Sequence, residues 1–174
     1  MLVTLWNSFF SICCFKKAPE DLPASRELLV LSLAGYSIGS FLLAISSQSA
    51  DVAALSGIID AGLLATITYL LLTLFRLPER WLQTTSALFG TGIIFSLFAL
   101  PFSHMLASTA DTDPFFLVLL LVIISLLLWN ISVMAHIMRH ALSSSFALGV
   151  FMALIYVWVI TAAITTMFPP QNLS

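Results

Sequence analysis

Asp60 is the one carboxylate that lies well inside an apolar stretch of this sequence. An ionisable side chain in such a setting costs about 2.5–3.5 kcal/mol on membrane-insertion scales, and it commonly marks a functional site. If neighbouring apolar stretches are aligned as antiparallel membrane helices, several residues at the same membrane depth as Asp60 carry hydroxyl groups. None of the residues at that depth is cationic. These hydroxyls belong to Ser37, Ser40, Ser96, Thr161 and Thr165.

Two kinds of role fit this candidate intramembrane polar site of Asp60, Ser96 and Thr161. A carboxyl group among hydroxyls could bind a proton or a cation that enters from the outer side of the membrane. Alternatively, it could join helices through hydrogen bonds, or start a helix that begins later than the hydropathy indicates. We expect a structural role here, because a proton path normally needs several ionisable groups within the membrane.

A second polar pattern follows the fourth apolar stretch and continues beyond its end. Ser125, Trp129, Ser132, His136 and Arg139 are spaced four, three, four and three residues apart, which places them on one face of a helix. Polar groups in lipid turn toward protein, so the stripe from Trp129 to Arg139 is expected to face the bundle interior or a cytoplasmic cleft. His136 could sense pH or bind a metal there. His140, four residues on, is the only candidate for a second ligand, and it has no carboxylate nearby on the same helix. We therefore favour a structural histidine and predict no metal site.

The composition excludes several classes of protein. Of 174 residues, 60% are hydrophobic and 8% are charged, whereas soluble domains are about 45–50% apolar and about 25% charged. Six basic residues spread along the chain are too few for a surface that binds nucleic acid. Two cysteines cannot form a disulfide framework or a zinc site. The sequence has no Ser/His/Asp set on its polar segments, no HExxH motif and no nucleotide loop. It therefore predicts a non-enzymatic membrane protein without catalytic residues or a cofactor.

Five apolar stretches are long enough to cross a bilayer, which takes roughly 20 residues of helix. They cover about residues 28–46, 52–75, 84–102, 115–138 and 146–168. Pro78, Asp113-Pro114 and Pro169-Pro170 mark helix starts and a helix end. Because the loops are short, consecutive helices should be antiparallel neighbours. The sequence thus predicts an all-α, five-helix transmembrane domain over residues 18–174.

The basic residues indicate how this domain is oriented. All six fall on one side of the predicted membrane, while the loops on the other side carry Asp51, Asp111 and Asp113. By the positive-inside rule the basic side is cytoplasmic, so the N-terminus would lie in the cytoplasm and the C-terminus in the periplasm of a bacterial inner membrane. The basic residues are Lys16, Lys17, Arg26, Arg76, Arg80 and Arg139.

Residues 1–17 form a separate amphipathic segment. Its apolar side chains recur at helical spacing on one face, and two lysines follow directly. About 14 residues are too few to span a bilayer. The pattern predicts an interfacial helix anchored by Trp6, which either binds the membrane surface or packs against the bundle as a structural foot. The apolar residues are Leu2, Leu5, Trp6, Phe9, Phe10 and Cys13.

Small residues are spaced for close helix packing. Gly35 and Gly39 form a GxxxG motif in the first stretch, and Gly57 and Ala61 share a small-residue face in the second. Packing within one chain accounts for these faces, and a homo-oligomer through one of them stays open.

Two segments resemble a known family. Residues 80–92 (RWLQTTSALFGTG) and 134–142 (MAHIMRHAL) are similar to uncharacterised bacterial members of the Yip-domain membrane proteins. The resemblance implies five helices and a cytoplasmic N-terminus. Eukaryotic Yip proteins act in vesicle traffic and contact small GTPases, but their DLYGP signature is absent from this sequence.

The sequence leaves two functions to compare. We expect a scaffold or accessory subunit that acts through contacts with membrane lipids and other membrane proteins. The alternative is a transport or ion-coupling component that uses Asp60.

Overall fold

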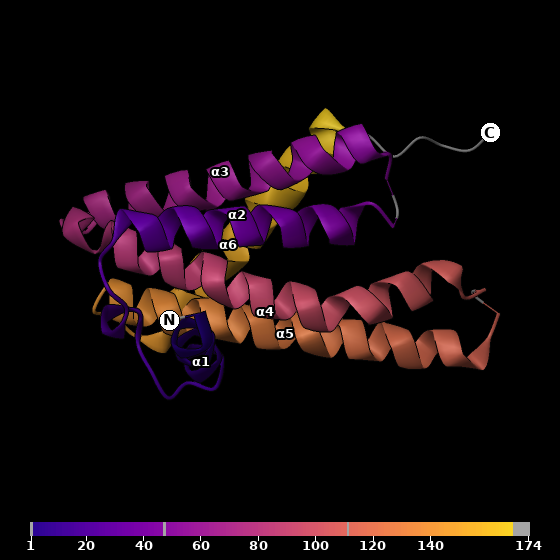
Figure 1. The fold of residues 1–174 in the computed structure, drawn as a ribbon, viewed down its shortest axis with the longest axis horizontal. Helices are drawn as coiled ribbons and strands as arrows, with labels where there is room; N and C mark the ends of the chain where they lie inside the picture. The colour runs from indigo at the N-terminus through magenta and orange to yellow at the C-terminus, as the bar shows by residue number, and fades with distance from the viewer. Residues whose placement is uncertain (1, 47, 111, 169–174) are drawn as a thin grey trace.

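The structure of the protein is a computed structural model that describes residues 2–46, 48–110 and 112–168. The described residues form six α-helices and two short 3₁₀ turns, with no β-strand among them (Figure 1). In chain order these are α1 (Leu2–Cys13), η1 (Pro19–Asp21), α2 (Arg26–Ala44), α3 (Ala50–Leu74), η2 (Pro78–Arg80), α4 (Trp81–Ser108), α5 (Pro114–Ala141) and α6 (Phe146–Met167).

The helices α2 to α6 are long and apolar enough to cross a membrane, which confirms the predicted all-α bundle of five transmembrane helices behind a short N-terminal helix. Two of them are longer than predicted. The third span continues as α4 past Pro101 to Ser108, and the fourth continues as α5 to Ala141. Proline loses only one helical hydrogen bond, so an otherwise apolar helix continues through it when neighbours hold the chain.

Side-chain caps start three of the spanning helices. Ser25 accepts a hydrogen bond from the backbone N–H of Leu28 (3.0 Å), and Ser145 caps α6 in the same way. Asp113 accepts from the N–H of Phe115 (2.8 Å), as the Asp-Pro pair predicts. Two further sequence markers, Asp111 and Pro169-Pro170, lie outside the described residues.

The helix α4 lies at the centre of the bundle, between α2 and α5 (Figure 1). From Thr84 to Ser96 every residue except Ile93 is buried. This run consists mainly of small side chains, which allow α1, α2, α3 and α5 to approach the same helix.

The small-residue faces serve packing within the chain. A Cβ atom added to Gly35 or Gly39 would meet α4 at Ile93 or Ser96, and Gly57 faces the backbone of α2. Ala61 is 2% exposed. These residues therefore serve close helix packing within the chain, as the sequence predicts.

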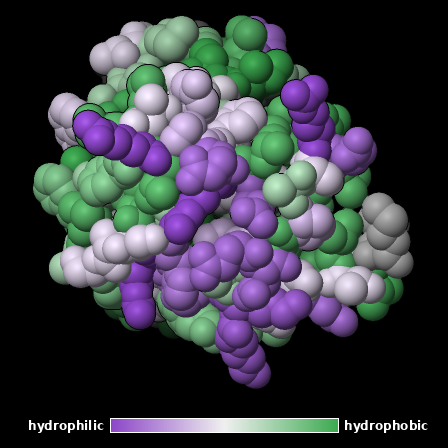
Figure 2. Space-filling model, turned by 90° about the vertical axis from the view of Figure 1, so that its left-hand side faces the viewer, coloured by the Kyte–Doolittle hydropathy of each residue, from purple (hydrophilic) through white to green (hydrophobic). Residues whose placement is uncertain are grey.

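All six basic residues lie at one end of the bundle, which we call the basic end. This end contains α1, η1, η2, the starts of α2, α4 and α6, and the last turns of α3 and α5. Figure 2 views it directly and shows hydrophilic side chains gathered over its centre and lower part, with apolar side chains mainly above them and at the sides. That arrangement fits a polar surface bordered by the apolar walls of the bundle.

Candidate functional site

The carboxylate of Asp60 is held by two tyrosines from two other helices. The hydroxyl of Tyr156 on α6 donates to Oδ1 (2.5 Å), and the hydroxyl of Tyr36 on α2 donates to Oδ2 (2.6 Å). We call these three residues the Asp60 cluster. Because α3 begins at Ala50, Asp60 lies well inside its helix, and the alternative of a helix-start aspartate is wrong.

Two cavities of about 310 Å³ each meet at this cluster. One lies between α2, α4 and α5 and includes Ser96 and Asn130 in its wall. The other lies among α2, α3 and α6 and runs toward Gln48, in the connection between α2 and α3 at the end opposite the basic end. Asp60 and Ser40 belong to the walls of both cavities.

The structure brings some of the predicted hydroxyls to Asp60 and leaves others outside. Ser40 and Ser96 line a cavity with Asp60, although the Ser96 hydroxyl itself donates to the carbonyl of Gly92 (2.9 Å). Thr161 is exposed on α6 and lines neither cavity. Thr165 is also exposed and donates to the Thr161 carbonyl.

The two tyrosines are not predicted by membrane depth, because depth locates a side chain only near its own backbone. A tyrosine hydroxyl lies far from its own backbone, so Tyr36 and Tyr156 reach Asp60 across the space between helices. The sequence does contain a signal for them. Tyrosines of membrane helices concentrate at the interfaces, yet two of the three in this chain stand in the middle of predicted spans.

No cationic side chain takes part in the cluster or in the walls of the two cavities, as far as the described residues extend. Each carboxylate oxygen accepts one phenolic hydrogen bond and has a further lone pair. The arrangement can therefore do two things: join α2, α3 and α6 through hydrogen bonds, and offer oxygen atoms to a proton or small cation that enters a cavity.

The polar stripe of α5 binds the N-terminal segment. The indole N–H of Trp129 donates to the carbonyl of Cys13 (3.0 Å), and Nε2 of His136 forms a hydrogen bond with the carbonyl of Lys17 (3.0 Å). The Phe15 ring packs edge-on against His136 with their centroids 5.2 Å apart. Because the last carbonyls of a helix have no partner within it, these side chains complete the C-terminal end of α1 and the residues after it.

The remaining stripe residues do not contribute to this contact. Ser132 donates to the carbonyl of Leu128 in its own helix (2.8 Å), Ser125 does the same with Leu121, and Arg139 is exposed. The stripe is thus divided between a helix contact and ordinary polar surface.

The helix α1 presents different faces to the bundle and to its surroundings. Ile12 and Cys13 are fully buried, and the ring of Phe9 lies over Gly90 of α4. Away from these contacts, Phe10 is 40% exposed. The structure therefore has the predicted N-terminal helix packed against the bundle, with Phe10 still exposed.

Two further side chains, which no sequence pattern singles out, hold the elements of the basic end together. The Arg80 guanidinium donates to the carbonyls of His140 (3.1 Å) and Ala141 (3.0 Å) at the end of α5. Gln83 donates to the carbonyl of Leu22 (2.7 Å) in the segment that follows α1. A cation at a helix C-terminus is electrostatically favourable, so Arg80 has a structural role besides its place in the charge pattern.

The packing of α1 predicts very different thiol reactivities for Cys13, the last residue of this helix, and for Cys14, which follows it. Burial, with a smaller contribution from Cys14, raises the pKa of Cys13 from 9.0 to about 12, so its thiolate fraction near neutral pH falls by roughly a thousandfold. With Cys14→Ser, maleimide should label the remaining Cys13 at least tenfold more slowly than it labels Cys14 in a Cys13→Ser variant. Equal labelling rates in native membranes would show that α1 is not packed as described.

No protein-family model matches this chain, and no curated protein and no solved structure matches it either. The arrangement of its own residues is therefore the basis for any function assigned to it.

Proposed function

We propose that this chain is a small non-enzymatic protein of a bacterial inner membrane, with its N-terminus in the cytoplasm, that acts through contacts with lipids and other membrane proteins. The observation that carries the proposal is the position of α1. Phe9, Ile12 and Cys13 fix the helix to the bundle, while Phe10 is exposed and the exposed Lys16 and Lys17 follow the helix. An apolar face beside basic residues is the usual signature of a helix at a membrane surface.

The proposal gives each face of α1 a separate role. Hydrogen bonds from Trp129 and His136 fix the position of the end of α1 against α5. A helix so fixed can present its outer face to the lipid headgroup region or to a neighbouring protein without being ordered first, which lowers the entropic cost of binding.

Photo-crosslinking at two adjacent positions tests this proposal. Azidophenylalanine at Phe10, which is 40% exposed, should form adducts with lipid or with another membrane protein when irradiated in native membranes. The same group at Phe9, which is 7% exposed and faces α4, is the matched control and should give adducts only within the chain. If position 10 yields no external adduct, or no more than position 9, the proposed role of α1 is wrong.

A second candidate function, transport or ion coupling, is favoured by the two cavities that meet at Asp60. Asp60→Asn should lower sodium- or proton-dependent flux, or growth under pH and sodium stress, by at least fivefold if this carboxylate carries the ion. Asp51→Asn is the control, because Asp51 is an exposed carboxylate in the first turn of the same helix. Flux and growth like those of the unmodified protein in the Asp60 variant would eliminate this candidate.

A further inference from the structure

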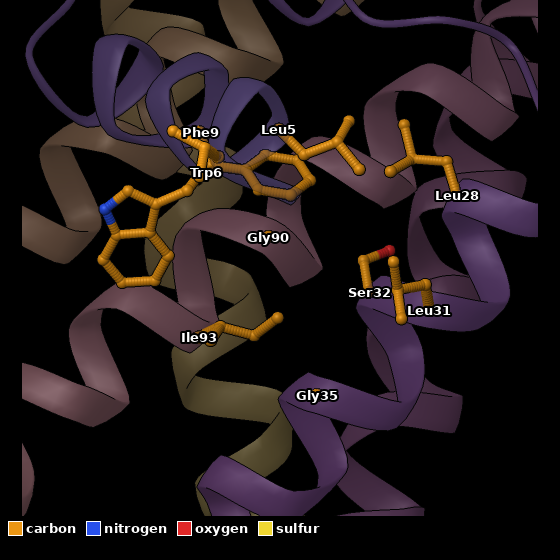
Figure 3. Close-up of a pocket in the computed structure, with 10 residues that line it drawn as sticks. Leu5, Trp6, Phe9, Leu28, Leu31, Ser32, Gly35, Gly90 and Ile93 are labelled. Carbon is orange, nitrogen blue, oxygen red and sulfur yellow. The ribbon is translucent and has the colours of Figure 1, made fainter. Parts of the chain in front are cut away.

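A cavity of about 420 Å³ lies beneath α1, between this helix, α2 and α4 (Figure 3). Four of its wall residues come from α1, four from α2 and two from α4. Its size is within the range of about 300–1,000 Å³ that is usual for ligand pockets.

The wall offers almost nothing to a polar ligand. Ser32 has the only side-chain hydroxyl among the wall residues, and this hydroxyl already donates to the carbonyl of Leu29 (3.1 Å). The indole nitrogen of Trp6 points to the side away from Leu28 (Figure 3). A stable buried water needs two to four polar partners, and an empty apolar cavity forfeits dispersion contacts. A hydrocarbon chain is the occupant that such a wall suits.

The rim of the cavity opens where a lipid could enter. Val3 is 73% exposed and Leu31 is 48% exposed, whereas Phe9 and Leu28 are buried. Leu31 lies little more than one turn along α2 from Arg26, which starts that helix. The opening is therefore at the border between the apolar wall of the bundle and its basic end.

The headgroup can be inferred from the charges at this end. The basic end has six basic residues against four acidic ones (Glu20, Asp21, Glu27 and Glu79). Near a membrane surface, basic residues attract anionic lipid. An anionic phospholipid is thus favoured over a zwitterionic one at the same opening.

We propose that this cavity holds an acyl chain of an anionic phospholipid whose headgroup lies at the basic end. The inference rests on the proposed function, because it names a lipid among the contacts of α1. In this arrangement the acyl chain fills the space between α1, α2 and α4, against a wall that is apolar apart from Ser32 and the indole nitrogen of Trp6.

Native mass spectrometry of protein extracted from phosphatidylglycerol vesicles tests the proposal. The unmodified chain should retain one phosphatidylglycerol molecule. Ser32→Phe, which fills the cavity, should lower the retained fraction at least fivefold, whereas Val30→Phe, on the exposed lipid-facing side of the same helix and outside the cavity wall, should not. Retention from phosphatidylcholine vesicles should be at least fivefold weaker than from phosphatidylglycerol.

A second variant separates loss of lipid binding from misfolding. This control is needed because Ser32 is 2% exposed and a phenylalanine there would displace core side chains. Leu31→Trp narrows the rim at an exposed position and should lower retention without loss of helical circular dichroism. Unchanged retention in Leu31→Trp and Ser32→Phe, or equal retention of the two lipids, overturns the proposal. Phe10 is not part of the cavity wall, so adducts at position 10 together with unchanged retention would contradict the cavity inference alone.

Discussion

Gly149→Ala should destabilise the bundle by about 1–3 kcal/mol, the usual cost of overpacking a well-packed contact. Gly149 of α6 faces the backbone of α5 at Ala135, where an added Cβ would approach the carbonyl carbon to 3.0 Å and collide with its oxygen. A backbone cannot turn aside as a flexible side chain can, so α5 and α6 would have to separate. The midpoint of unfolding by SDS in mixed micelles, followed by tryptophan fluorescence, measures this effect.

Gly62→Ala is the matched control for this substitution. Gly62 is exposed on α3, and a Cβ there would meet nothing within 4 Å. Alanine is a better helix former than glycine by about 0.8–1.0 kcal/mol, so this variant should be neutral or slightly more stable. Similar losses of stability in the two variants would contradict the close approach of α5 and α6.

The positions of the spanning helices could be predicted because they depend on a local property of the sequence. A run of about 20 apolar residues must form a helix in lipid, since only a helix satisfies its own backbone there. The central place of α4 was not predicted. Its buried run from Thr84 to Gly92 is no more apolar than the other spans, and its centrality comes from small side chains that let several neighbours approach it.

The contacts of α1 could be predicted only in part, because they join distant parts of the chain. The spacing of Trp129 and His136 correctly placed both on one face of a helix that turns toward protein. Their partners, the carbonyls of Cys13 and Lys17, are 116 and 119 residues away in sequence. A backbone carbonyl has no side-chain identity, so no residue pattern could reveal that α1 would be the element bound there.

The candidate site shows the same limit. The sequence identifies Asp60 as the unusual residue because charge within a span is rare. Which hydroxyls surround it depends on the rotation of each helix and on the length of each side chain. Membrane depth alone gives neither, so it predicts Thr161, which is exposed, and not Tyr36 and Tyr156, which hold the carboxylate.

The Asp60 cluster should contribute measurably to the stability of the bundle. Phenylalanine in place of Tyr156 removes only the hydroxyl that donates to Oδ1, and phenylalanine in place of Tyr36 removes the donor to Oδ2. A lost hydrogen bond to a charged or buried group costs about 1–3 kcal/mol, so each substitution should lower the unfolding free energy by that amount. The effect of Tyr156→Phe should fall mainly on α6, which contacts α3 much less extensively than it contacts α5.

A double-mutant cycle separates this hydrogen bond from the packing of the rings. In an Asp60→Ala background the carboxylate is gone, so Tyr156→Phe should cost far less than it does in the unmodified chain, with a coupling of about 0.5–3 kcal/mol. Tyr69→Phe is the control: this third tyrosine is 49% exposed, and phenylalanine retains its ring contact with Trp81. A cycle with no coupling, or a loss from Tyr69→Phe as large as that from Tyr156→Phe, would show that Asp60 does not join these helices. Coupling together with unchanged flux in Asp60→Asn would instead assign this carboxylate to helix association, which is the role that the sequence favours.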